Sequence, residues 1–262
     1  MYMHYLQHMP EQLIQHMTFN SQNTGTIISW VLCMTFGYLL YTQALKQVIR
    51  EKVDPYPLFL HCWMITIDSI GTVTFWVLAF KYHFFWLFTL MGIGLPIWVC
   101  LEATCIVYAV KHNRSEDFAG LAKGEVSVKQ ATIWALGMIA LSFTVNMWML
   151  SMVGGVNNAA IFISYPFTNY VFTYWTWRTW TKRGVSGTRY GNSMGLQWVI
   201  LIQVTLMWVP KLSWYLNITP FFNEPWYYLC GLGASCLAAY NMYHLAKLPP
   251  KEKVVDGKKT VW

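Results

Sequence analysis

Ionisable side chains interrupt the long apolar segments of this chain, where they are costly unless they have a task. Asp68 lies near the centre of the apolar stretch 57–80, and His61 lies seven residues before it. Glu102 lies in the next apolar stretch, 84–110. A charged carboxylate at the centre of a bilayer costs roughly 2.5–3.5 kcal/mol on insertion scales, so such residues usually mark a pathway, a partner or a reaction. Two carboxyl groups close together at low dielectric are not both charged cheaply, so we expect one to be protonated and able to act as a Brønsted acid.

These three residues are expected at similar depths in a membrane. On a helix, His61 and Asp68 share a face with Thr72. At about 1.5 Å per residue, Asp68 lies roughly 16 Å and His61 roughly 6 Å above the cytoplasmic end of their helix. Glu102 lies roughly 12 Å above the cytoplasmic end of the next helix. The three could therefore line one pocket in the inner half of the membrane. In the alternative interpretation, the two acids cross-link neighbouring helices with His61 as their partner.

Other side chains in the apolar segments could complete such a pocket. Aromatic ring faces stabilise positive charge, and Trp98, one helical turn before Glu102, is the ring that we expect beside the acid. Helix packing and contacts between helices are alternative roles for all of these residues. The residues that we assign to substrate binding are Trp63, Thr72, Trp98, Asn146, Tyr165, Asn169, Tyr240 and Asn241.

The composition indicates the class of protein that holds these residues. Of the 262 residues, 56% are hydrophobic and 11% are charged, and the mean hydropathy is +0.35. Such values are expected where lipid replaces water around most of the surface. Seven apolar segments have the length of roughly 20 residues that a helix needs to cross a bilayer. They are 25–45, 57–80, 84–110, 131–153, 158–178, 195–210 and 226–246. We therefore predict an all-α, polytopic membrane protein with a bundle of seven transmembrane helices.

The positions of the cations predict the orientation of this bundle. The chain has 18 Lys and Arg residues, and all except Lys81 and Lys211 lie in the first, third and fifth loops and the C-terminal tail. Cations accumulate on the cytoplasmic side of membrane proteins. This pattern predicts an extracytoplasmic amphipathic segment at 1–24, a transmembrane domain at 25–248, and a basic cytoplasmic tail at 249–262.

The net charge of +7 follows mainly from this topology. It favours contact with anionic lipids at the cytoplasmic face, and no nucleic-acid-binding module is present in the sequence. All six cysteines lie inside predicted spans, so no disulfide is implied. His4 and His8 have the i,i+4 spacing of a metal clip, but solvated surface histidines are the favoured interpretation. No cofactor and no metal site is predicted.

Several of these features resemble the integral-membrane terpene cyclases of fungal meroterpenoid and indole-diterpene pathways. The features are seven apolar segments, a carboxylate on the second, and the stretch Arg183-Gly184-Val185-Ser186-Gly187 after the fifth. The resemblance implies protonation of an epoxide or olefin of a prenylated substrate by an acid in the membrane, followed by ring closure through carbocations. Asp68 takes the place of the glutamate on the family's second span. The family's second acid, on the seventh span, has no counterpart, because 226–248 contains neither Asp nor Glu.

The sequence thus predicts an integral multi-pass membrane protein with an acidic pocket formed by Asp68, Glu102 and His61. In the leading interpretation, this pocket binds or cyclises a small hydrophobic, isoprenoid-like molecule by acid catalysis. A first alternative is a small-solute transporter that uses Asp68 and Glu102 for proton coupling or solute recognition. A second alternative is a non-catalytic membrane accessory protein.

Overall fold

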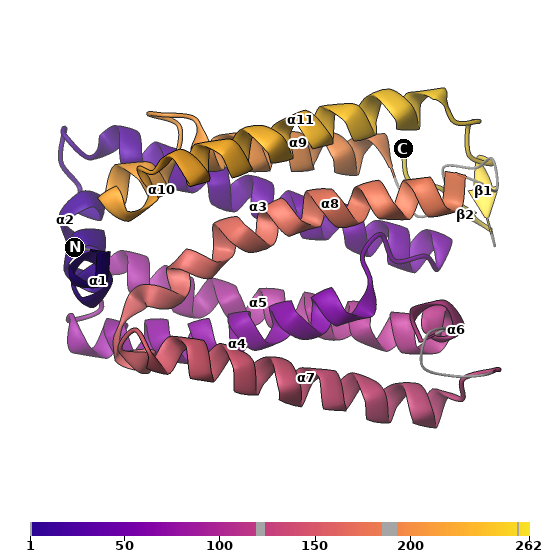
Figure 1. The fold of residues 1–262 in the computed structure, drawn as a ribbon, viewed down its shortest axis with the longest axis horizontal. Helices are drawn as coiled ribbons and strands as arrows, with labels where there is room; N and C mark the ends of the chain where they lie inside the picture. The colour runs from indigo at the N-terminus through magenta and orange to yellow at the C-terminus, as the bar shows by residue number, and fades with distance from the viewer. Residues whose placement is uncertain (1, 119–123, 185–192, 256) are drawn as a thin grey trace.

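The computed structural model describes residues 2–118, 124–184, 193–255 and 257–262, with the side chains at 5–118, 124–178, 193–254 and 257–262. The His4 side chain and most of the stretch 183–187 lie outside the described residues. Long helices lie side by side as a bundle (Figure 1). They are α3 (Thr24–Glu51), α4 (Leu58–Lys81), α5 (Trp86–Tyr108), α7 (Val128–Ser151), α8 (Ser164–Gly184), α9 (Met194–Trp208) and α11 (Pro225–Lys247).

Short elements connect and cap these helices. Two short helices, α1 (Tyr2–Gln7) and α2 (Met9–Met17), precede the bundle. Between the long helices lie a π-helical turn (Ala109–Asn113), α6 (Arg114–Asp117), α10 (Trp214–Ile218) and the 3-10 turns Gly155–Asn157, Ala159–Ile163 and Pro220–Phe222. The strands β1 (Val254–Val255) and β2 (Lys258–Lys259) pair antiparallel near the C-terminus. The predicted all-helical class is therefore confirmed, with this small hairpin as the one sheet in the described parts of the chain.

Four helices in the described residues are long and apolar enough to cross a membrane. They are Thr24–Glu51, Leu58–Lys81, Trp86–Asp117 and Val128–Ser151. Their length and composition indicate a membrane protein. The later helices differ in length or polarity, since α9 has only 15 residues and a span needs roughly 20.

Local sequence signals fix where several helices begin and end. Ser127 and Gln130 form a reciprocal capping box at the start of α7, which satisfies two backbone N–H groups that have no partner within the helix. The Ser193 side chain accepts from the backbone of Leu196 at the start of α9. At the other end of α3, Lys52 adopts a left-handed conformation (φ 53°), which terminates the helix and turns the chain toward α4.

The bundle encloses its helices unequally. In the most apolar window of α4, 56% of the residues are buried, but the corresponding share of α7 is 17%. The apolar side chains Ile133, Leu136, Leu141 and Phe143 of α7 are exposed, as expected for a helix that faces lipid. The helix that carries Asp68 and His61 is thus the most enclosed of the four.

The two ends of the bundle are covered by different termini. The apolar side of α2 is buried against the bundle through Met9, Leu13 and Met17. Pro10 lies in the first turn of this helix. Helices α1 and α2 lie at one end of the bundle, and the β1–β2 hairpin lies at the opposite end (Figure 1). At the hairpin end, the buried Glu51 carboxylate binds Lys251 Nζ at 2.8 Å and the Val261 backbone N–H at 2.8 Å.

Candidate functional site

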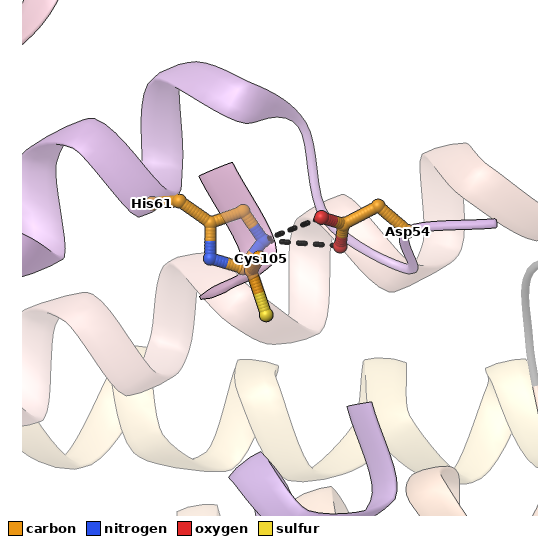
Figure 2. Close-up of side chains that lie close together, drawn as sticks. All are labelled: Asp54, His61 and Cys105. Carbon is orange, nitrogen blue, oxygen red and sulfur yellow. Dashed lines mark hydrogen bonds and ion pairs between the residues drawn. The ribbon is translucent and has the colours of Figure 1, made fainter. Parts of the chain in front are cut away.

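A buried imidazole lies between two buried carboxylates at the start of α4. His61 Nδ1 contacts Glu102 Oε2 of α5, and His61 Nε2 lies 3.0 Å from Asp54 Oδ1 and 2.9 Å from Asp54 Oδ2. All three side chains are buried. Figure 2 shows the Asp54 carboxylate facing the imidazole ring. The predicted proximity of His61 and Glu102 is therefore present as a direct contact.

The connector between α3 and α4 holds Asp54 in this position. Pro55 and Pro57 lie on either side of Tyr56, and proline fixes its backbone φ angle near −65°. The backbone N–H of Tyr56 donates to Asp54 Oδ1 at 3.0 Å. This local turn fixes the carboxylate next to the first turn of α4, where His61 lies. Burial, followed by the charge of Asp54, raises the pKa of Tyr56 well above its usual value, so the Tyr56 hydroxyl stays neutral and able to donate.

Asp68 lies near the middle of α4 and is completely buried. Within the described residues, neither of its carboxyl oxygens has a hydrogen-bond partner. The charge of Glu102 acts on the Asp68 carboxyl group, and the charge of Asp68 acts on the hydroxyl groups of Tyr41 and Tyr165. Thr72, on the same helix, donates to the backbone carbonyl of Asp68 at 2.7 Å and leaves the carboxyl group unpaired.

A small cavity of about 20 Å³ lies among α3, α4, α5, α8 and α9. Among its lining side chains, Trp98 Nε1, Tyr165 Oη and Gln203 Oε1 are buried polar atoms without a hydrogen-bond partner in the described structure. A buried polar atom without a partner costs about 1–3 kcal/mol. The cavity has room for about one water molecule, and its polar lining indicates a bound polar group.

Aromatic rings form one wall of this cavity. Tyr41 stacks on Trp98, with ring centroids 5.5 Å apart and an interplanar angle of 23°. Tyr165 approaches the edge of Trp98 at 6.4 Å, and Tyr38 lies at 5.1 Å from it. Three tyrosine rings thus pack against Trp98, on the side of α5 that also carries Glu102. Such rings stabilise a positive charge in an apolar site.

A wider cleft of about 260 Å³ between α3 and α5 adjoins the cavity. The two share Met34, Met91 and Trp98 as lining residues. The cleft is also lined by Ile93 and Leu90, which are exposed on the bundle surface. Methionine side chains are flexible and fill irregular space, so Met34 and Met91 form an adaptable boundary between the outer cleft and the cavity.

Some of the other predicted site residues line the small cavity, and the rest lie elsewhere between the helices. Asn169 lines the cavity, together with Trp98 and Tyr165. Trp63 instead lines two clefts of about 580 and 530 Å³ beside α7 and α8. Asn146 donates to Thr66 Oγ1 at 3.0 Å and links α7 to α4.

The two residues predicted on α11 lie away from the acidic cluster. Asn241 is buried, and it donates to the Thr173 carbonyl of α8 at 3.2 Å. Tyr240 is 47% exposed and packs its ring on His244. The structure brings neither residue to the cavity, because the side of α11 that faces the bundle contacts α8 and α9.

Sequence reasoning did not single out four residues of this region: Tyr41, Asp54, Cys105 and Gln203. Asp54 lies outside the apolar segments, although it is seven residues before His61, the same spacing that separates His61 from Asp68. Cys105 lies three residues after Glu102 and so shares its side of α5. Both spacings could have marked these residues as neighbours.

Comparisons with protein-family models, with curated proteins and with solved structures gave no match for this chain.

Proposed function

We propose that this protein is a membrane enzyme that acts by acid catalysis on a small hydrophobic, isoprenoid-like molecule dissolved in the bilayer. The observation that carries the proposal is the completely buried Asp68 carboxyl group, which has no hydrogen-bond partner in the described structure. A charged carboxylate without donors is strongly disfavoured in such surroundings. A neutral, protonated Asp68 fits the site, and it can donate its proton to a ligand.

The reaction that suits this site begins and ends at Asp68. Its carboxyl group gives a proton to an epoxide oxygen or an olefin of the substrate, and a neighbouring double bond of the substrate closes the ring on the resulting cation. The faces of Trp98 and Tyr41 stabilise the positive charge. The Asp68 carboxylate then takes a proton from a carbon beside the final cation. The acid is regenerated, and the product is an isomer of the substrate.

The apolar cleft between α3 and α5 supports entry from the membrane. Ligand pockets usually have volumes of about 300–1,000 Å³, and the cleft of about 260 Å³ approaches this range once Met34 and Met91 move aside. An isoprenoid chain in the cleft would place its polar end among the unpaired groups of the cavity. The charge of Glu102 acts on Asp68, and Glu102 contacts His61, so the three ionisable groups are linked.

The proposal includes the seven-span topology. The four long apolar helices provide the first four spans, and α8, α9 and α11 provide the remaining three within the bundle. An odd number of crossings is supported by the positions of the N-terminal helices and the C-terminal hairpin at opposite ends (Figure 1). The distribution of cations then places the N-terminus outside and the C-terminus in the cytoplasm.

The test uses the full-length protein in lipid nanodiscs with an epoxidised farnesyl phenol as the probe. Wild-type protein is expected to form a product of unchanged mass without any ion gradient. General acid catalysis contributes about 10²–10⁴-fold, so D68N should lower the rate by this factor while the far-ultraviolet circular dichroism stays unchanged. E125Q removes an exposed carboxylate and should have the wild-type rate. Conversion at the wild-type rate by D68N, or no conversion by the wild type, would overturn the proposal.

A second candidate function is a proton-coupled transporter of a small cationic solute. It is favoured by the combination of a buried carboxyl group with stacked aromatic rings, because aromatic faces and a carboxylate together recognise organic cations. The Asp68 site also lies near the middle of its helix, the depth at which transporters bind solutes. In sealed proteoliposomes, this function predicts choline uptake that depends on a proton gradient and is lost in D68N. The enzyme predicts no such uptake.

A further inference from the structure

Three side chains that can bind a metal ion lie close together around His61. Asp54, His61 and Cys105 each offer one ligand atom, and these atoms all lie within 4.8 Å of one another. Figure 2 shows the Cys105 side chain next to the imidazole ring, with the Asp54 carboxylate at another side of the same ring. The three come from different elements, namely the α3–α4 connector, α4 and α5, so tertiary packing alone brings them together.

The burial of these three side chains, and a neighbouring hydroxyl group without a partner, point to a ligand. All three residues are buried, and Cys105 is a free cysteine. Both Asp54 carboxyl oxygens face Nε2 of the His61 ring, and the hydroxyl oxygen of the buried Tyr56 has no hydrogen-bond partner in the described structure. A buried hydroxyl group without a partner is costly, and a water molecule bound to a metal ion would satisfy it.

The partner of the second imidazole nitrogen supports the same conclusion. Nε2 of His61 faces Asp54, and Nδ1 contacts the Glu102 carboxylate. A histidine that binds a metal usually donates its other N–H to a carboxylate, which fixes the tautomer and the ring orientation. Glu102 is placed to accept that hydrogen bond, so a bound ion would take the place of the direct contact between Nε2 and the Asp54 carboxylate.

The charges of the donor set suit a divalent ion. The Asp54 carboxylate and the Cys105 thiolate carry two negative charges, which cancel those of a divalent cation within a buried site of low dielectric. In the described part of the chain, His61 is the ion-pair partner of both Asp54 and Glu102. Oxygen, nitrogen and sulfur donors together are typical of zinc and unlike the oxygen-only sites of magnesium and calcium.

We propose that Asp54, His61 and Cys105 bind a zinc-type divalent metal ion, with Glu102 as the carboxylate that orients His61. Binding releases the thiol proton of Cys105 to solvent. The fourth position holds a water molecule next to the Tyr56 hydroxyl group. The ion ties the α3–α4 connector to α5 and holds Glu102 in place, and this role does not depend on the proposed reaction at Asp68.

The test measures the metal content of the purified full-length protein. Protein supplied with zinc and then freed of unbound ions should contain one zinc per chain by mass spectrometry of the metal. Protein loaded with cobalt instead should show a thiolate-to-cobalt charge-transfer band and the visible bands of a tetrahedral site. C105S and D54N should each lose the bound zinc, and C105S should also lose the charge-transfer band. E102Q should keep the metal with an affinity lowered by about 10–100-fold.

A matched control distinguishes ligation from a general effect of losing a buried thiol. Cys62 is also buried, on α4 next to His61, and its thiol donates to the Ala135 carbonyl at 3.8 Å. C62S should therefore keep one zinc per chain and the cobalt spectrum. If C105S does not fold, the metal content of D54N and the cobalt spectrum of the wild type still decide. Wild-type protein without bound zinc, or without a cobalt–thiolate band, would overturn the proposal. Full zinc content in both C105S and D54N would do the same.

Discussion

Replacing Gly71 with alanine provides a direct test of the packing around Asp68. Gly71 lies one helical turn after Asp68 on α4. A Cβ atom at this position would lie 2.8 Å from Tyr165 Oη and 2.9 Å from Leu95 Cδ1. Both distances are shorter than side-chain carbons tolerate, so the Tyr165 hydroxyl group and the Leu95 methyl group both have to move. The same change should therefore displace Tyr165 from the cavity.

The expected size of the effect follows from two opposing contributions. Overpacking of a well-packed core costs typically about 1–3 kcal/mol, and exchanging glycine for alanine within a helix gains about 0.8–1.0 kcal/mol. Gly137 on α7 supplies the control, because a Cβ atom there has nothing within 4 Å. G137A should raise the free energy of unfolding by up to about 1 kcal/mol. G71A should be less stable than G137A by the overpacking cost of about 1–3 kcal/mol.

The assay is equilibrium unfolding in mixed detergent micelles, followed by tryptophan fluorescence. The double variant G71A/Y165F removes the oxygen atom that the new Cβ meets. The G71A substitution should therefore cost less stability in the Y165F protein than in the wild type. The cost that remains is due to Leu95, and a double-mutant cycle measures the two parts. Equal stabilities of G71A and G137A would refute this packing. So would a cycle without coupling between positions 71 and 165.

Three further predictions concern other parts of the molecule. Lys251→Met leaves the buried Glu51 carboxylate without its cation and should lower the free energy of unfolding by about 3–5 kcal/mol. The double variant that also carries Glu51→Gln should lose less stability. Chemical denaturation of the two variants measures the difference. Burial and the hydrogen bond to Glu11 raise the pKa of Tyr82 from its usual value of 10.0 to about 12. Because the folded state holds the phenol proton more tightly, this contribution to stability is complete below pH 10 and is lost as the pH rises through about 12. Y82F should lack this loss in a pH series of thermal unfolding, and an identical profile would contradict the assignment. Free zinc at about 100 times its dissociation constant should stabilise the wild type by about 2.7 kcal/mol relative to protein whose zinc is removed by a chelator. Equal melting temperatures with and without the chelator would contradict this.

The helices of this protein are encoded largely by local sequence. The predicted apolar segments agree with α4, α5, α7, α9 and α11 to within three residues at each end. Helix α3 ends six residues later than predicted. Helix α8 begins six residues later, because the stretch Ala159–Ile163 forms a 3-10 turn, and it also ends six residues later. The apolar composition also indicates the membrane. These properties depend on residues close together in the chain, and for this reason the sequence is sufficient to predict them.

The membership of the site was predicted only in part. His61, Glu102 and Asp68 stand out because ionisable residues are rare in apolar segments. Tyr240 and Asn241 were placed in the same group on their polarity alone, yet they lie on α11 away from the cavity. The polarity of a residue does not reveal which side of its helix faces the bundle.

The sequence by itself determined that the protein is helical, that it has helices fit for a membrane, and that three ionisable side chains lie inside them. Only the tertiary structure decided that Glu102 contacts His61, that Asp68 has no partner, and that Asp54 and Cys105 join the cluster. The physical reason is that these helices are apolar on nearly every side. Their hydrophobic pattern does not specify a rotation or a register, so packing between segments distant in the chain determines which polar groups meet.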